Sequence, residues 1–244
     1  MIDWLKRSTF EKGADPQIDL NGVAVPIALR RHATAKRMTL RLAPDGEEVR
    51  ITLPRWARSD EAIAFAHSRS EWLTVQHAKV PQKQDLKPGS EIQYRGEAVR
   101  IEWAEQARRK PVLAGGAVRM GGPMAGLQTR LKRWMEREAL NLFEEDMADY
   151  TANAALSPVP VALSRAQKRW GSCSEKSRIR LNWRLIQAPD FVRRSVVAHE
   201  VAHLVHFDHS PAFYSLLGDI YEHDLSAADR WLKEQGRSLY TSFG

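Results

Sequence analysis

One short motif constrains this chain more than any other feature: His199-Glu200-x-x-His203, which has the form H-E-x-x-H. The residues around it lack Gly and Pro, and Asp190 can cap a helix that begins just before them. On a helix, the two histidines lie one turn apart on the same face, so both imidazoles can reach one ion. The motif therefore predicts a metal-binding helix over residues 190–206.

Glu200 lies about 100° from His199 around such a helix, off the ligand line but close enough to contact a water molecule on the ion. Zinc lowers the pKa of a coordinated water, and a neighbouring carboxylate can accept the proton as the water attacks a carbonyl or phosphoryl centre. Cys173 is the single cysteine, too few for a closed structural zinc site built on thiolates. The sequence thus predicts a zinc-dependent hydrolase with Glu200 as the catalytic base.

A catalytic zinc ion usually has a third protein ligand, and His209 is the first candidate. On a continuous helix, His209 would lie about 15 Å beyond His199, so the helix must end and the chain must fold back. Phe207-Asp208 is a poor helical continuation, whereas Ser210-Pro211 is typical of the start of a new helix. This pattern predicts the required break.

Two other residues compete for the third ligand position. His206 lies on nearly the same face of the helix as His199, but it is two turns along, so it cannot easily share an ion with both His199 and His203. A downstream acid such as Glu222 is the other alternative. We expect zinc on His199, His203 and His209, with these two residues as the alternatives.

The rest of the chain indicates an α+β fold. Short alternating apolar runs predict strands near residues 23–29, 38–42, 49–53, 92–94, 99–103, 112–113 and 118–120, with one helix at 59–77. Gly121-Gly122-Pro123 interrupts the chain before a long helix at 124–152. We expect an antiparallel β-rich domain with one helix at 1–122 and a metal-binding domain at 123–244, which includes an amphipathic strand at 178–186.

Composition and the pattern of apolar residues indicate the cellular compartment of the protein. One cysteine excludes an intrachain disulfide framework and is typical of a reducing compartment. Residues 1–10 lack the apolar core of a signal peptide, and no stretch of the sequence approaches the 18 or so apolar residues that span a bilayer. We therefore expect a cytoplasmic protein without a membrane partner. The net charge of +7 is only weak support for anionic partners.

A basic segment at 165–184 precedes the predicted metal-binding helix. It carries seven Lys or Arg residues against one acid, Glu175, and it includes Trp170. Such runs are often solvated faces, but this one can also bind a nucleotide or nucleic acid. The candidate substrate-binding residues are Arg169, Trp170, Arg178, Arg180, Arg184 and Tyr214, of which Tyr214 is also considered for stabilising an oxyanion.

Several segments together resemble a known family: His199-Glu200-x-x-His203 with His209-Ser210-Pro211-x-Phe213, Lys168-Arg169-Trp170-Gly171-Ser172-Cys173-Ser174, residues 180–186, and Arg37-Met38 with Leu40-Arg41-Leu42. The likeness is to the YgjP-like family of zinc metallopeptidase-like proteins and covers most of the chain. SprT-type and WLM-type proteases, which act on proteins crosslinked to DNA, share the histidine spacing. Metzincins have Gly where this chain has His206, so that class does not fit.

The resemblance implies a zincin-like catalytic half at 123–244, with zinc ligands at His199, His203 and His209 and Glu200 as the base. Some YgjP-like proteins are named as UTP pyrophosphatases, so the family leaves the substrate open. The first expectation is a metallopeptidase acting on peptides or proteins, with strand 178–186 as an edge beside the substrate. The alternatives are a metal-dependent nucleotide pyrophosphatase and a non-catalytic zinc-containing module that binds nucleic acid.

Overall fold

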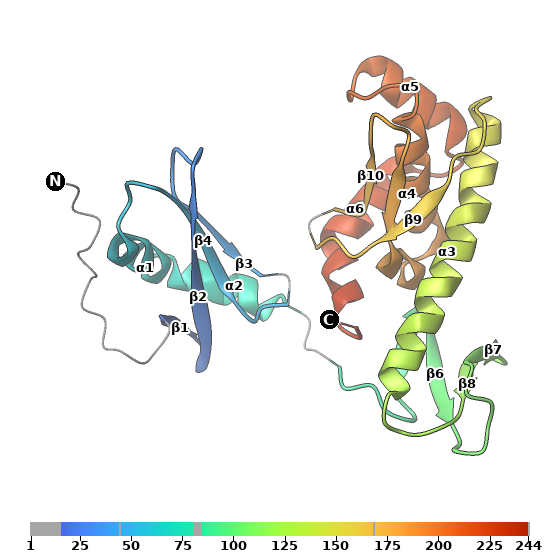
Figure 1. Cartoon of the computed structure of the whole chain (residues 1–244), viewed down its shortest axis with the longest axis horizontal. Coiled ribbons are helices and arrows are strands. Elements are labelled where there is room, and N and C mark those ends of the chain that lie inside the picture. Colours follow the sequence, from blue (N-terminus) through green and yellow to red (C-terminus); the bar gives the residue numbers. More distant parts are fainter. Residues whose placement is uncertain (1–15, 44, 81–83, 168, 244) are drawn as a thin grey trace. The chain divides into compact units, whose positions relative to one another are not determined.

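The computed structural model describes residues 16–43, 45–80, 84–167 and 169–243, and the chain forms two compact units, residues 1–82 and 83–244 (Figure 1). Residues 1–10, examined above for a signal peptide, and Lys168 lie outside the described residues. Of the helices in the described part of the chain, none combines the length and apolar character needed to cross a bilayer. The mixture of sheets and helices confirms the α+β class.

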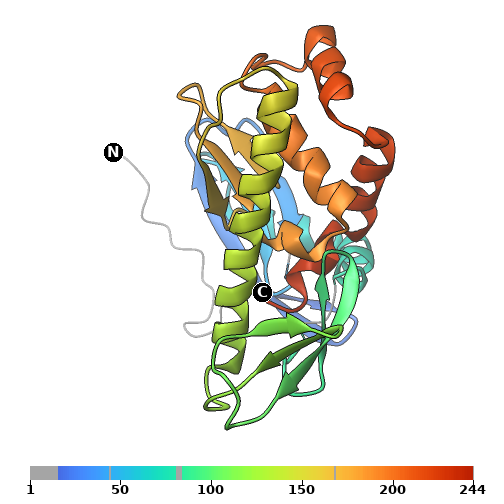
Figure 2. The ribbon, with the colours of Figure 1, turned by 90° about the vertical axis from the view of Figure 1, so that its right-hand side faces the viewer.

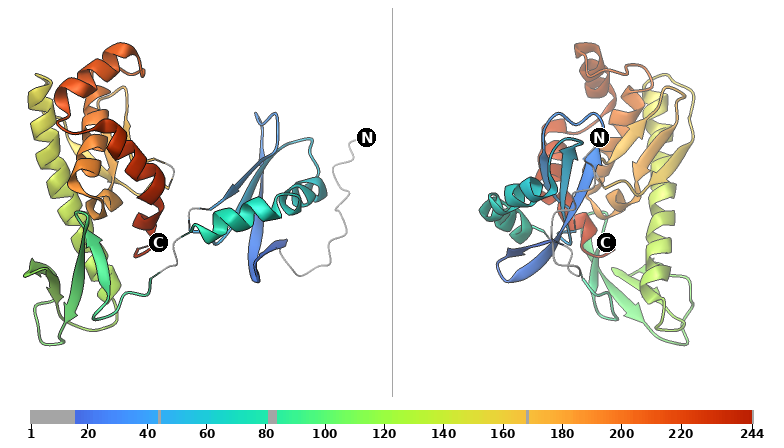
Figure 3. Two further views of the ribbon diagram at one scale, coloured as in Figure 1. Left: turned by 180° about the vertical axis from the view of Figure 1, so that it is seen from behind. Right: turned by 60° about the vertical axis from the view of Figure 1, so that its left-hand side comes forward.

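The first unit is a four-stranded sheet in the order β1-β2-β4-β3 with two helices on one face (Figure 3). Alternation along β4 explains this arrangement, because Val49, Ile51 and Leu53 are buried in the core that the helices complete. The elements are β1 (Gln17–Leu20), β2 (Val23–His32), β3 (Thr39–Leu42), β4 (Val49–Pro54), α1 (Ser59–His67) and α2 (Ser70–Ala78).

Two expectations about this unit are corrected. The single helix expected at 59–77 is two helices, with a break at Ser68-Arg69. The sheet is not purely antiparallel, because β2 and β4 run parallel. β3 and β4 form an antiparallel hairpin whose connection contains Asp45-Gly46.

The second unit contains two sheets joined by a long helix, α3 (Leu127–Asn153), and Figure 2 shows α3 running from one sheet to the other. One sheet has the order β5-β6-β8-β7, with β6 and β8 parallel, and the other has the order β10-β11-β9. The strands are β5 (Glu91–Tyr94), β6 (Glu97–Trp103), β7 (Val112–Ala114), β8 (Ala117–Met120), β9 (Val161–Ser164), β10 (Gly171–Cys173) and β11 (Ile179–Asn182). The helices are α3, α4 (Asp190–Ala202), α5 (Pro211–Ile220), α6 (Leu225–Gln235) and the short 3-10 helices η1 (Trp183–Gln187) and η2 (Gly236–Tyr240).

The chain divides near residue 82, earlier than the expected boundary after residue 122. The cause is packing: the β5–β6 hairpin shares one core with α3, where the Tyr94 ring stacks on Trp134 with centroids 5.3 Å apart. Residues 121–122 form a turn within this unit, in which the Gly122 carbonyl accepts a hydrogen bond from Trp103 Nε1 at 2.9 Å.

The strand expected at 178–186 is shorter and is not an edge. β11 ends at Asn182, whose side chain accepts a hydrogen bond from the Arg184 backbone amide and so begins η1. β11 is the central strand, and β10 is the edge strand that lies beside α4. The alternation pattern therefore cannot be extended beyond Asn182.

A buried ion pair attaches α4 to α3. Arg193 and Asp146 are both almost fully buried, and Arg193 Nε donates to Asp146 Oδ2 at 2.7 Å. Arg194 Nη1 also donates to Asp146 at 2.8 Å. Separating the two members of a buried pair leaves an uncompensated charge, which is costly. The ion pairs therefore hold α4 against α3.

Candidate metal centre

Three histidine side chains converge at the end of α4. His199 lies in the last turn of the helix, His203 caps its C-terminus, and His209 lies in the connection to α5. His199 Nε2 lies 3.1 Å from His203 Nε2 and 3.2 Å from His209 Nε2. The potential ligand atoms of all three residues lie within 4.8 Å of one another.

The chain returns to bring His209 into this cluster because α4 ends at Ala202 and a new helix begins at Pro211. Ser210 caps α5, since its Oγ accepts a hydrogen bond from the backbone amide of Phe213 at 3.4 Å. The break that Ser210-Pro211 predicted is confirmed.

The geometry of the cluster fits a tetrahedral metal site. Ligand atoms about 2.0–2.1 Å from zinc are about 3.3 Å apart in a tetrahedron, close to the nitrogen separations here. Nδ1 of His203 donates to the backbone oxygen of His206 at 2.9 Å, which leaves Nε2 directed at the other histidines. A backbone carbonyl in this position is typical of metal-binding histidines, because it fixes the ring and its tautomer.

The electrostatics of the cluster also suit a metal. Burial, together with the neighbouring His203 and His209, lowers the pKa of His199 to about 4. At neutral pH His199 is therefore uncharged, and the neutral imidazole is the form that binds a metal ion.

Phe213 forms the base of the cluster. Its side chain is fully buried, and its ring centroid lies 5.0, 4.6 and 4.9 Å from those of His199, His203 and His209. The ring restricts the orientation of all three imidazoles. Its role was missed in the sequence, although it belongs to the segment that carried the family resemblance.

Glu200 lies beside the cluster and is 5% exposed. Burial raises the pKa of Glu200 to about 7, against the opposing effects of the Arg169 charge and a hydrogen bond from the Cys173 backbone. Its Oε2 is buried and has no hydrogen-bond partner among the described residues. A carboxyl group in such surroundings can accept or hold a proton near neutral pH.

Gly171, at the start of β10, makes room for this carboxylate. A Cβ atom at this position would lie 2.7 Å from both Cγ and Cδ of Glu200. Glycine is therefore required by the close approach of β10 to α4, a requirement that the isolated sequence does not reveal.

We expect Gly171→Ala to displace Glu200 and to lower any hydrolytic activity by about 10²-fold, since a shift of about 1 Å can have that effect. Zinc content, measured by mass spectrometry of the metal, should stay unchanged because the three histidines are not touched. Gly218→Ala on α5 is the matched control, since a Cβ there meets nothing within 4 Å. Equal activity in the two variants would contradict this role for Gly171.

A cavity of about 630 Å³ opens beside His199 and Glu200. β10, α4, α5 and α6 enclose it, and among its described lining residues none is Lys or Arg. Most of its walls are apolar or aromatic: Trp170, Val196, Tyr214, Leu217, Leu225 and Leu232. The contribution of α6 was not foreseen, because α6 itself was not predicted.

The other candidate substrate-binding residues are dispersed. Trp170 and Tyr214 line the cavity, and the Tyr214 ring centroid lies 6.2 Å from that of His209. Arg169 is exposed, and its charge acts on Glu200. Arg178 is exposed in the connection before β11.

Two arginines and one acid do not lie where the sequence suggested. Gly171 and Cys173 face Glu200, and they pair with Leu181 and Ile179 of β11. Arg180 lies between these two β11 residues and pairs with Ser172. Its side chain is therefore on the opposite face of the sheet. Arg184 is 4% exposed and lies between the rings of Trp183 and Tyr240, so its expected exposed position is wrong. Glu222 is engaged elsewhere, because it accepts a hydrogen bond from Tyr150 at 2.7 Å.

Comparison with known proteins gives one match. The family described as YgjP-like, metallopeptidase domain, matches residues 36–235, a range that includes the three histidines, Glu200 and the cavity. A search of curated proteins finds no match, and a search of solved structures finds none either.

Proposed function

Because the chain belongs to the YgjP-like metallopeptidase family, we propose that it is a zinc-dependent peptidase with Glu200 as its general base. The observation that carries the proposal is the convergence of three histidine nitrogens beside a buried carboxylate and an apolar cavity. When held by His199, His203 and His209, zinc supplies polarisation of a carbonyl and a more acidic water.

In this mechanism Glu200 accepts a proton from the attacking water at a carboxylate oxygen. As the C–N bond of the substrate breaks, Glu200 returns that proton to the leaving amine, so the carboxylate is regenerated. Phe213 and the His206 carbonyl hold the histidines in place. Tyr214, which lines the cavity near His209, is the candidate for stabilising the oxyanion. We assign this arrangement of sheet and helix to the zincin-like class.

The edge strand β10 offers a binding position for an extended peptide. Trp170 O accepts from Asn182 N, and Ser174 N donates to Arg178 O. In an antiparallel ladder the intervening Gly171 and Cys173 then direct their main-chain groups away from β11. The Cys173 backbone donates to Glu200, so it is the main-chain groups of Gly171 that face the open edge. Addition of a substrate strand at such an edge is a common mode of peptide recognition, and here it supports a peptide substrate.

The cavity supports the same conclusion. A nucleoside triphosphate requires cations around its phosphates, but the described lining of the cavity contains no Lys or Arg. Its apolar walls fit a large apolar side chain of the residue next to the scissile bond. Nucleotide pyrophosphatase activity is the second candidate, and the exposed Arg169 near Glu200 is the observation that favours it.

Digestion of a peptide library by the zinc-loaded protein tests the proposal. We expect cleavage that a chelator abolishes and zinc restores, with a large apolar residue preferred on one side of the cleaved bond. Leu225→Trp narrows the cavity and should shift the preference to small residues, whereas Leu113→Trp on β7, outside the cavity lining, should not. A library left intact under all zinc conditions would argue against a peptidase.

We also propose a cytoplasmic location. The support is Cys173, which is a free thiol in the structure and is compatible with a reducing compartment.

A further inference from the structure

The first unit presents a positively charged sheet face opposite its two helices. On β2, β3 and β4 the residues that alternate with the buried ones face away from the helices. Arg30, Arg41 and Arg50 occupy this face, one on each strand, and all three are exposed. Among the described residues, Arg50 contacts Glu48, whereas Arg30 and Arg41 have no acidic partner.

The pairing of these strands places like charges against each other. Arg41 lies directly opposite Arg50 in the antiparallel β3–β4 pair, and Arg30 lies opposite Thr52, two residues further along β4. Like charges directly opposite destabilise a sheet. Glu48 offsets the charge of Arg50, but β2, β3 and the connection between them contain no acid, because the sequence has no Asp or Glu between Asp19 and Asp45. An arrangement that costs stability in the free protein suits a surface that binds an anion.

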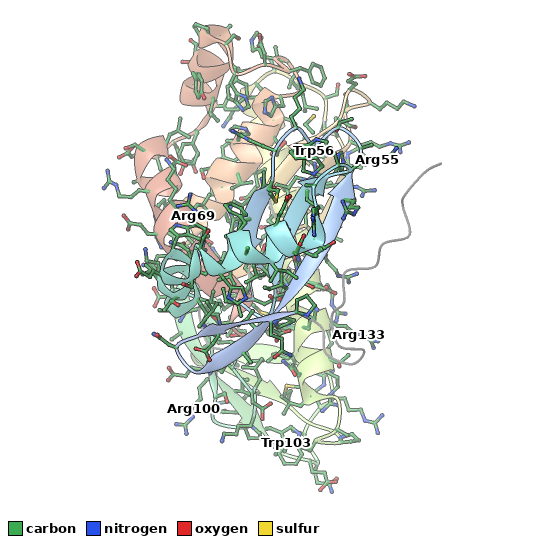
Figure 4. The ribbon with its side chains drawn as sticks, turned by 90° about the vertical axis from the view of Figure 1, so that its left-hand side faces the viewer. Arg55, Trp56, Arg69, Arg100, Trp103 and Arg133 are labelled. Atoms are coloured by element: carbon green, nitrogen blue, oxygen red, sulfur yellow. The ribbon has the colours of Figure 1, made fainter. Side chains whose placement is uncertain are left out.

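An exposed tryptophan lies at the end of this sheet. Trp56 follows β4 and is 75% exposed. The turn that carries it is held by Arg31, whose Nη1 donates to the carbonyl oxygens of Arg55 at 3.0 Å and of Ala57, and whose Nη2 contacts Ser59 Oγ at 3.2 Å. Figure 4 shows Arg55 and Trp56 next to each other on this turn. These hydrogen bonds fix the conformation of the turn and so hold Trp56 in its exposed position.

More basic residues surround the turn. The last residue of β4, Pro54, pairs with His32 at the end of β2, and β3 begins near the same end of β4. The connection between β2 and β3 therefore crosses this end of the sheet, and it carries Lys36 and Arg37, both exposed. The exposed Trp56 side chain and the basic residues Lys36 and Arg37 therefore lie at the same end of the sheet.

We propose that this surface of the first unit, comprising Arg30, Arg41, Arg50 and the Trp56 turn, binds single-stranded nucleic acid. Adjacent strands are about 4.8 Å apart, so the three arginines on three neighbouring strands extend over about 10 Å, a span that can contact more than one phosphate of a single strand. Trp56 provides a surface on which an unpaired base stacks. An acidic peptide would match the arginines but not the exposed ring. The inference goes beyond peptidase activity and uses no residue of the metal centre.

Fluorescence anisotropy of labelled 12-nucleotide oligothymidylate and oligouridylate with the full chain tests the proposal. We expect both to bind, with an affinity that falls as salt rises. Arg30→Ser, Arg41→Ser and Arg50→Ser together should reduce the slope of log K against log salt by about 2, since each phosphate contact on a single strand contributes about 0.7. Trp56→Ala should weaken binding about 5- to 150-fold without changing that slope.

Matched controls distinguish binding at this surface from a general effect of losing positive charge. Arg100→Ser, Arg108→Ser and Arg133→Ser remove the same charge from exposed positions of the second unit, and Trp72→Ala removes another exposed tryptophan of the first unit. Both should retain affinity within about twofold, as should Arg178→Ser with Arg180→Ser. Circular dichroism should show that the triple variant of the sheet face melts no lower than the wild type, because the Arg41–Arg50 repulsion is removed. The single variant Arg30→Ser should reduce the slope of log K against log salt by about 0.7. It leaves the Arg41–Arg50 pair unchanged.

Several results would overturn the proposal. These include absence of oligonucleotide binding at low salt, equal loss of binding in the charge-matched control, loss of binding in the Arg178 and Arg180 variant instead, and an unchanged affinity after Trp56→Ala. Binding to vesicles containing phosphatidylserine but not to oligonucleotides would assign the surface to anionic lipid and would also overturn it.

Discussion

Glu200→Gln is expected to lower peptide cleavage by about 10²- to 10⁴-fold, the contribution of a general base. Glutamine has nearly the same shape as glutamate and fits the same space beside Gly171, but it cannot accept the proton of the attacking water. The histidine cluster does not involve this side chain, so zinc content should stay unchanged. Steady-state cleavage of one identified peptide, with metal analysis of the same samples, provides the measurement.

Ser226→Ala is the matched control for this substitution. Ser226 lines the same cavity on α6, but it has no part in the proposed proton transfer, so the variant should retain near wild-type cleavage. Full activity of Glu200→Gln would remove Glu200 from the mechanism. Loss of zinc from Glu200→Gln would instead mean that the carboxylate is needed for metal binding.

His209→Ala is expected to weaken zinc binding by at least about 10²-fold, because two histidines remain and even the loss of a supporting residue costs about 10- to 100-fold. The fold should persist, since His209 is exposed and the Ser210 cap of α5 is independent of its ring. Competition with a chromogenic zinc chelator measures the affinity, and circular dichroism verifies the fold.

His206→Ala distinguishes the two candidate third ligands. His206 contributes only its backbone oxygen to the His203 ring, and alanine retains that oxygen, so this variant should keep zinc. A greater loss of zinc in His206→Ala than in His209→Ala would reverse the assignment.

The parts of the site that follow from local sequence could be predicted. His199, Glu200 and His203 share one helix, so helical periodicity alone places them together. His209 reaches them through a helix break, and that break has its own signal in Ser210-Pro211. Most of the strands expected in the first 120 residues are present for the same reason, since alternation is a local property.

The remaining features depend on tertiary contacts. β10 has only three residues and exists because it pairs with β11, so no periodicity could reveal it. Arg184 continues an apparent alternation, but η1 turns its side chain into the interior between two aromatic rings. The sequence Gly121-Gly122-Pro123 has the composition of a linker, yet hydrogen bonds from Gly121 N to Arg108 O and from Trp103 to Gly122 O make it a turn inside the second unit.

The most direct test of the proposed chemistry is hydrolysis by the zinc-loaded protein in ¹⁸O-enriched water, with a peptide library and UTP supplied in parallel. If the attacking water reacts with a peptide carbonyl, mass spectrometry will find ¹⁸O in the new C-terminal carboxyl groups of the peptide products, and UTP will remain intact. Incorporation of ¹⁸O into the phosphate groups of UTP products, with the peptides uncleaved, would contradict the peptidase assignment and identify a nucleotide pyrophosphatase.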